Sequence, residues 1–193
     1  MTNSIRLLGV AVPAALLLAA CSDDPAAPRD TPEVDLHVIA AKCDFMTGGG
    51  SVVFGGGRVT FGVHAGRSRG GTVFGHFNVI DHRTDTPTRY QSTSITRYGR
   101  AVAPFFVTVP TTGVTRVVEG QVRVNGGAVR NFTAYLNDSG EPGRGVDRIF
   151  FRVAGNQVIS GPASGGLPTL RLLTGGNLQF HDHCIPGNPQ SGK

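Results

Sequence analysis

Lysine is almost absent from this sequence of 193 residues: only Lys42 and Lys193 occur among its 18 basic residues. A phosphate-binding loop needs a lysine followed by serine or threonine after its glycines. The glycine clusters at 48–50 and 55–57 therefore predict turns or bulges beside strands instead. The sequence also lacks the G-x-S-x-G motif of serine hydrolases. Both absences argue against an enzyme.

Helical periodicity is also missing, because no window keeps an apolar repeat of 3.6 residues over three turns. The 28 glycines and 12 prolines are scattered along the chain. Short runs rich in Val, Phe, Thr and Ile instead alternate between apolar and polar residues, as half-buried strands do. These runs are 58–64, 72–80, 91–96, 105–109, 115–124, 128–136, 148–153, 157–159, 170–173 and 177–180.

Turn residues separate several of these runs. Asn125-Gly126-Gly127, Gly155-Asn156 and Gly175-Gly176 each accept the positive φ of a tight turn. About ten short strands at this spacing predict an all-β fold, a single antiparallel β-sandwich with a β-barrel as the alternative. Since no helix is expected to cover the sheet, another sheet must do so.

The N-terminus has the three parts of a bacterial lipoprotein signal. Arg6 precedes an apolar stretch that is too short to span a bilayer as a helix. Leu18-Ala19-Ala20-Cys21 then matches the site at which such signals are lipidated on cysteine and cleaved. We expect acyl chains on Cys21 to hold the protein on a membrane. Ser22 follows the cysteine, which favours the outer membrane in a bacterium with two membranes.

The other two cysteines form an even pair once Cys21 carries lipid. Cys43 and Cys184 lie near the two ends of the expected domain, and an oxidising exterior permits a disulfide between them. The alternative is two free thiols or metal ligands.

The chain then divides into four segments. Residues 1–20 are the signal peptide, and 21–42 form a tether rich in Pro, Asp and Ala. Residues 43–187 are long enough for one domain with a sizeable core, and 188–193 form a flexible tail.

Several glycine-rich motifs occur in an order that resembles the bacterial post-COAP domain. They are Met46–Gly50, Gly71–Phe77, Gln91–Thr96, Asn137–Gly143 with Asp147–Phe150, and Gly175–His181. The resemblance covers residues 45–181. It implies a secreted or surface module, often found beside adhesive or immunoglobulin-like modules, with no defining activity.

The loop from Asn137 to Asp147 is the best candidate for a bound ion. Asn137, Asp138, Glu141 and Asp147 offer the oxygen ligands that calcium prefers, although their spacing is not that of a helical calcium loop. The alternative is a polar turn whose acids pair with nearby arginines. Calcium is the only cofactor suggested here.

Histidines offer a second candidate metal site. His181 and His183 are two residues apart, so in a strand both side chains lie on one face. A zinc site needs further ligands, which His64, His76 or His82 would have to supply. The alternative is a pair of exposed or hydrogen-bonded side chains.

The formal net charge of +5 raises the question of a polyanionic partner. The arginines are spread along the chain, as on solvated faces, so we do not expect nucleic acid to bind. We expect a lipid-anchored surface protein, structural or binding in function, whose partner is an extracellular protein or polysaccharide. The alternative is a small hydrolase of envelope or extracellular polymers, which needs converging side chains from Asp81, His82, Asp85, Glu119 and Asp138.

Overall fold

The computed structural model describes residues 43–102 and 106–183, which all belong to the unit His37–Lys193. These residues form twelve β-strands and no helix, so the all-β prediction is confirmed. The strands are β1 (Asp44–Phe54), β2 (Gly57–Arg67), β3 (Val73–Asp81), β4 (Thr88–Arg100), β5 (Val114–Val124), β6 (Val129–Asp138), β7 (Arg148–Val153), β8 (Asn156–Ile159), β9 (Ala163–Ser164), β10 (Leu167–Pro168), β11 (Arg171–Leu172) and β12 (Gly175–His181). None of the described segments is a helix of the length and apolarity needed to traverse a bilayer.

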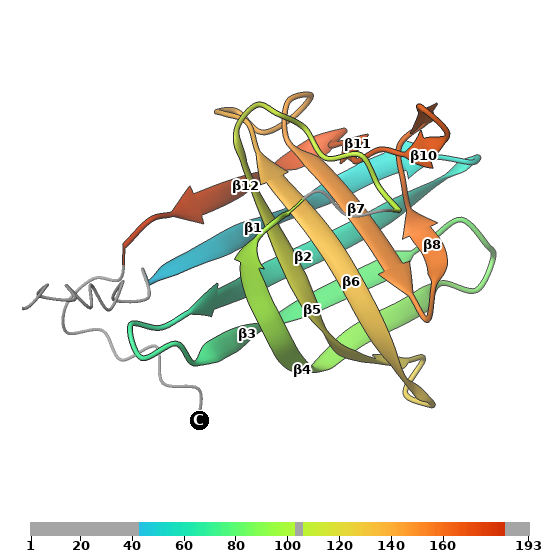
Figure 1. The fold of residues 1–193 in the computed structure, drawn as a ribbon. Helices are drawn as coiled ribbons and strands as arrows, with labels where there is room; N and C mark the ends of the chain where they lie inside the picture. Colours follow the sequence, from blue (N-terminus) through green and yellow to red (C-terminus); the bar gives the residue numbers. More distant parts are fainter. Residues whose placement is uncertain (1–42, 103–105, 184–193) are drawn as a thin grey trace, which may run out of the picture. The chain divides into compact units, whose positions relative to one another are not determined.

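Ten of the strands form one antiparallel sheet, in the order β11-β7-β6-β5-β4-β3-β2-β1-β12 with β8 beside β7. The strands β9 and β10 form a separate ribbon. Figure 1 shows β5, β6 and β7 crossing in front of β12, β1 and β2, so the sheet curves back over itself. The two layers expected of a sandwich are thus opposite parts of one curved sheet. Backbone pairing among the described strands does not join β11 to β12.

The main core lies between these layers. Alternate residues of β2 and β3 are buried, as the period-two pattern predicts. Phe77 of β3 packs its ring against Phe132 of β6 and Phe151 of β7, with ring centroids 5.5 and 5.2 Å apart. These aromatic contacts join the two layers.

Two features bend the sheet. The pairing of β4 with β5 shifts register twice, once between Ser92 and Ser94 and once between Ile95 and Arg97, and such bulges increase local twist. In β1, Gly48 has φ +134°, a conformation that L side chains rarely adopt, and a Cβ there would overlap the carbonyl oxygen of Asn177 in β12. Curvature therefore depends on glycine in the middle of a strand.

Most predicted strands agree with the structure, and three predictions are wrong. Gly48–Gly50 lies inside β1, and Gly175-Gly176 begins β12 instead of forming a turn. The run 105–109 is not a strand in its described residues: Thr108 makes one isolated bridge to Thr169. In the first two cases the glycines pair across β1 and β12, where close backbone approach is needed.

The segment that follows β4 covers the outer face of the sheet. Val107 is buried against Val117, Tyr135 and Phe150, with Leu170 nearby, in a second hydrophobic cluster. The strands β6 and β7 are therefore buried on both faces over most of their length. The apolar run at 105–109 reflects this covering role.

Candidate functional site

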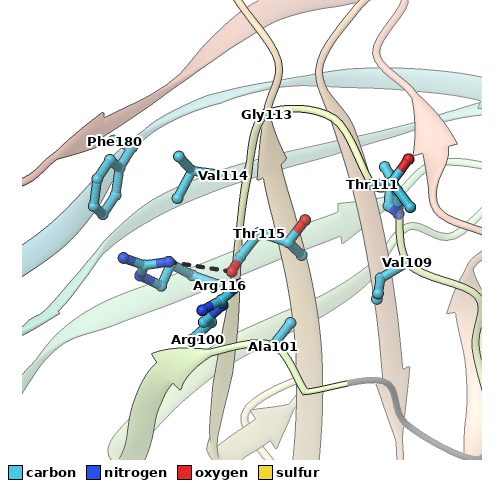
Figure 2. Close-up of a pocket in the computed structure, with 10 residues that line it drawn as sticks. Arg100, Ala101, Val109, Thr111, Gly113, Val114, Thr115, Arg116 and Phe180 are labelled. Carbon is cyan, nitrogen blue, oxygen red and sulfur yellow. Dashed lines mark hydrogen bonds between the residues drawn. The ribbon is translucent and has the colours of Figure 1, made fainter.

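A cavity of about 560 Å³ opens between the end of β4, the start of β5 and β12. Figure 2 shows Arg100, Arg116 and Phe180 on one side of the cavity, with Val109 and Thr111 on the other. The volume lies in the range of sites for small ligands. Its lining combines two cations, threonine hydroxyls and apolar side chains.

The two arginines face each other across a strand pair. Arg100 of β4 is directly opposite Arg116 of β5 in the antiparallel register, and like charges in that position repel. Arg116 donates from Nε and Nη2 to Oδ2 of Asp44, at 3.0 and 2.5 Å, and its guanidinium lies 4.3 Å from the Phe180 ring centre. Arg100 is exposed and has no hydrogen-bond or ion-pair partner within the described part of the chain. The Asp44 carboxylate thus pairs with Arg116, while Arg100 keeps its charge without an ionic partner among the described residues.

Buried polar groups without partners lie close to this cavity. Among the described residues, the Tyr98 hydroxyl and the Arg67 Nε are buried and have no hydrogen-bond partner. Burial raises the pKa of Tyr98 well above its usual value; the Asp44 carboxylate adds to the rise and Arg116 opposes it. The hydroxyl therefore stays protonated near Arg116, which lines the cavity. Native proteins rarely leave such donors unpaired.

A smaller cavity of about 250 Å³ shares Val109, Pro110 and Thr111 with the first. Arg148 of β7 lines it, together with the hydroxyl-bearing residues Thr108, Thr111, Thr112 and Thr169. The segment 109–111 thus lies between two cavities that both combine arginine with threonine hydroxyls.

The predicted calcium residues come together, but the carboxylate oxygens of Asp138 and Asp147 accept hydrogen bonds from backbone amides. Oδ1 of Asp147 accepts a hydrogen bond from the Ser139 amide, and Oδ2 accepts one from the Leu178 amide. Oδ2 of Asp138 accepts a bond from the Phe180 amide. Leu178 and Phe180 belong to β12, at the end of the sheet order. We call Asp138, Asp147 and their bonds the carboxylate latch.

The other two predicted calcium residues are also engaged. Nδ2 of Asn137 donates to the Thr112 carbonyl at 2.9 Å, and Oε1 of Glu141 accepts a bond from Asn177 at 2.8 Å. Within 43–102 and 106–183, no three or more His, Cys, Asp and Glu side chains are grouped so that they could hold a metal ion. In the structure the side chains of this loop are engaged in hydrogen bonds within the protein, and the calcium site stays a prediction.

The predicted zinc residues make separate contacts. Nε2 of His181 lies 2.9 Å from the Thr47 hydroxyl, and the His181 ring stacks on Phe45 with centroids 4.3 Å apart. His183 is exposed, with Nδ1 2.6 Å from a carboxylate oxygen of Asp182. The described residues therefore do not form the three-ligand or four-ligand site that the zinc hypothesis requires.

A row of aromatic and imidazole rings crosses the outer face of β12, β1, β2 and β3. His64 lies within ring-contact distance of Phe45, Phe74 and His76, with centroids 6.1, 5.5 and 5.7 Å away. Burial lowers the pKa of His64, and the nearby His76 and His181 lower it further. The sequence analysis named His64, His76 and His181 as possible zinc ligands, but it did not predict that Phe45 and Phe74 lie beside them, because these residues come from four strands.

The residues named for a hydrolase lie in three separate places, although His82 is close enough to Asp81 to help lower the pKa of Asp81. Asp81 forms an ion pair with Arg83 after β3, and Glu119 pairs with Arg97 on β5 and β4. Asp138 is part of the carboxylate latch at the far end of β6. His82 and Asp85 lie in the connection between β3 and β4.

The structure bears on one of the three cysteines. Cys43 is buried and disulfide-bonded. Cys184 and Cys21 lie outside the described residues, as do the signal peptide 1–20, the tether 21–42 and the tail 188–193. The specific pairing of Cys43 with Cys184 and the lipid on Cys21 stay predictions.

No family model, curated protein or solved structure matches the chain. The resemblance to the post-COAP domain stays a prediction. The class that fold and site define is an antiparallel β-domain with an arginine-lined cavity.

Proposed function

We propose that the protein is a non-catalytic binding module, held at the cell envelope by lipid on Cys21, whose cavity takes acidic sugar groups of an extracellular polysaccharide. The observation that carries this proposal is the register of Arg100 opposite Arg116: Asp44 pairs with Arg116, and none of the described residues pairs with the Arg100 side chain. A bound carboxylate would relieve the repulsion and give Arg100 a charge-assisted partner.

Threonine hydroxyls around both cavities favour a sugar as the rest of the ligand, since they can donate to and accept from its hydroxyl groups. A single nucleic-acid strand would need aromatic rings for base stacking. Among the described residues, Phe180 is the one aromatic ring that lines either cavity, and the guanidinium of Arg116 already covers it. The cavity chemistry therefore favours an acidic saccharide over a nucleic acid.

The test is calorimetric titration of the protein with linear galacturonate oligomers at low salt. We expect binding that weakens as salt rises, and no binding of the matching neutral galactose oligomers. Arg100→Gln should reduce affinity at least about tenfold, because a hydrogen bond to a charged group contributes roughly 1.5–3 kcal/mol.

The matched control is Arg130→Gln, which also removes one exposed positive charge but lies near the opposite end of the β5–β6 pair. It should leave affinity within about twofold. Failure of every acidic oligomer to bind, or equal loss in both variants, would show that the cavity is not an acidic-sugar site.

A further inference from the structure

His64 and His76 form a cross-strand pair on the face that points away from the core. They are direct partners in the antiparallel register of β2 and β3, and the flanking Val63, Ala65 and Phe77 are buried on the other face. Their ring centroids lie 5.7 Å apart with an interplanar angle of 68°. His76 is exposed and His64 half-buried, so both rings can be reached from solvent.

This spacing suits two imidazoles that bind one metal ion. A metal–nitrogen bond is about 2.1 Å long, which places two rings on a shared ion with their centroids roughly 5–6 Å apart. Imidazole nitrogen is a ligand for zinc, copper and nickel, whereas calcium and magnesium prefer oxygen. Neutral imidazole is the binding form, and the environment of His64 disfavours its charged form.

We propose that His64 and His76 form an open two-imidazole site for a divalent transition-metal ion, with copper(II) bound most tightly. Copper stands at the top of the affinity order of the divalent first-row metals. Water or a group from a partner molecule completes the coordination.

Neighbouring rings limit the site to this pair. His181 is held by the Thr47 hydroxyl and by stacking on Phe45. Phe45 itself contacts both His181 and His64, so its ring lies next to each of them. No group of three metal-binding side chains occurs in the described ranges, in agreement with a site that has two protein ligands.

The test is a copper(II) titration of the full chain, followed by calorimetry and by the nitrogen hyperfine pattern in electron paramagnetic resonance. We expect His64→Gln and His76→Gln each to weaken binding at least tenfold and to remove one nitrogen from the spectrum. Calcium should not compete. The matched control is His82→Gln, which removes an exposed histidine just after β3 and should leave both readouts unchanged.

Copper binding that persists unchanged in both variants would place the ion elsewhere and overturn the proposal. A circular dichroism melt of each variant separates loss of the site from loss of the fold. Since neither histidine lines the arginine cavity, sugar binding can fail while copper binding succeeds, and the reverse.

Discussion

At the scale of single residues, several arginine side chains pack on aromatic rings. The guanidinium groups of Arg83 and Arg171 lie 4.4 and 4.3 Å from the centre of the Phe54 ring. Arg152 covers Phe106 in the same way at 3.4 Å. A planar guanidinium stacks on rings better than an ammonium group does. The scattered arginines that the sequence shows are therefore partly packing residues.

The ion pair of Asp81 with Arg83 makes a pH-dependent contribution to stability. Hydrogen bonds from Arg83 lower the pKa of Asp81 below its usual 3.8. A carboxyl whose pKa is lowered by folding stabilises the fold above its unfolded pKa and loses that contribution as pH falls through the folded value. We expect Asp81→Asn to be less stable than wild type at pH 7, by less than about 1 kcal/mol for this partly exposed pair.

Urea unfolding at a series of pH values checks this prediction. The difference between wild type and Asp81→Asn should shrink progressively below pH 3.8. A difference that stays constant down to pH 2 would contradict the stated cause.

Asp147 is fully buried and accepts two backbone hydrogen bonds. Its replacement by alanine leaves the amides of Ser139 and Leu178 without acceptors, and each lost partner costs roughly 1–3 kcal/mol. We expect Asp147→Ala to lower the free energy of unfolding by about 3 kcal/mol in a denaturant titration.

Asp85→Ala is the control for this latch, because Asp85 is exposed, and it should change stability by less than about 0.5 kcal/mol. Calcium should leave the melting temperature of the wild type unchanged. A rise with calcium that Asp147→Ala abolishes would restore the calcium hypothesis and contradict the latch.

At the scale of secondary-structure elements, β1 was the strand hardest to predict. Its glycines at 48–50 read as turn residues because glycine is a frequent turn former. In the structure they allow β1 to approach β12 and β2 closely while the sheet bends. Only the pairing partners show this need, and they lie far away in the sequence.

Gly48→Ala tests the bend in β1. A side chain at φ +134° is strained, and its Cβ would meet the backbone of Asn177, so we expect a loss of at least about 2 kcal/mol in the free energy of unfolding. Gly62→Ala is the matched control on the neighbouring strand: its Cβ meets nothing within 4 Å. Equal stability of the two variants would show that β1 tolerates a side chain at the bend.

The strand β7 matches its predicted range of 148–153, although its burial does not alternate: Ile149, Phe150 and Phe151 are all buried. There each buried side chain faces a core on one side or the other. The run at 105–109 has the same apolar character, but Val107 packs on a sheet face instead of joining its ladder. An apolar composition indicates that a segment is buried. It does not tell whether the segment is a strand of the sheet or packs on the face of the sheet.

At the scale of the whole molecule, the fold class was predictable and the candidate site was not. Turn residues and period-two alternation are local signals, and the turn at Asn125-Gly126 appears as expected, with φ values of 47° and 73°. The cavity needs Arg100, Arg116 and Phe180, which come from three strands. The curvature of the sheet brings β12 near β4 and β5, and no local sequence pattern predicts this curvature.

The predicted lipid anchor at Cys21 concerns the location of the whole chain. If Cys21 carries the lipid, as we propose, Cys21→Ala should move the protein from the membrane fraction to the soluble fraction of lysed cells, because acyl chains would supply the attachment. Ser22→Ala is the control and should stay membrane-bound. A variant without Cys21 that remains in the membrane fraction would contradict the lipoprotein prediction.

The most direct test of the binding proposal is nuclear magnetic resonance of the ¹⁵N-labelled protein during titration with galacturonate oligomers. We predict that the side-chain Nε–Hε signals of Arg100 and Arg116 shift in a saturable way, together with the amides of Thr111 and Thr115. The Arg130 side chain should not move. Absence of saturable shifts, or shifts confined to residues outside the cavity, would contradict the claim that this arginine-lined cavity is the binding site.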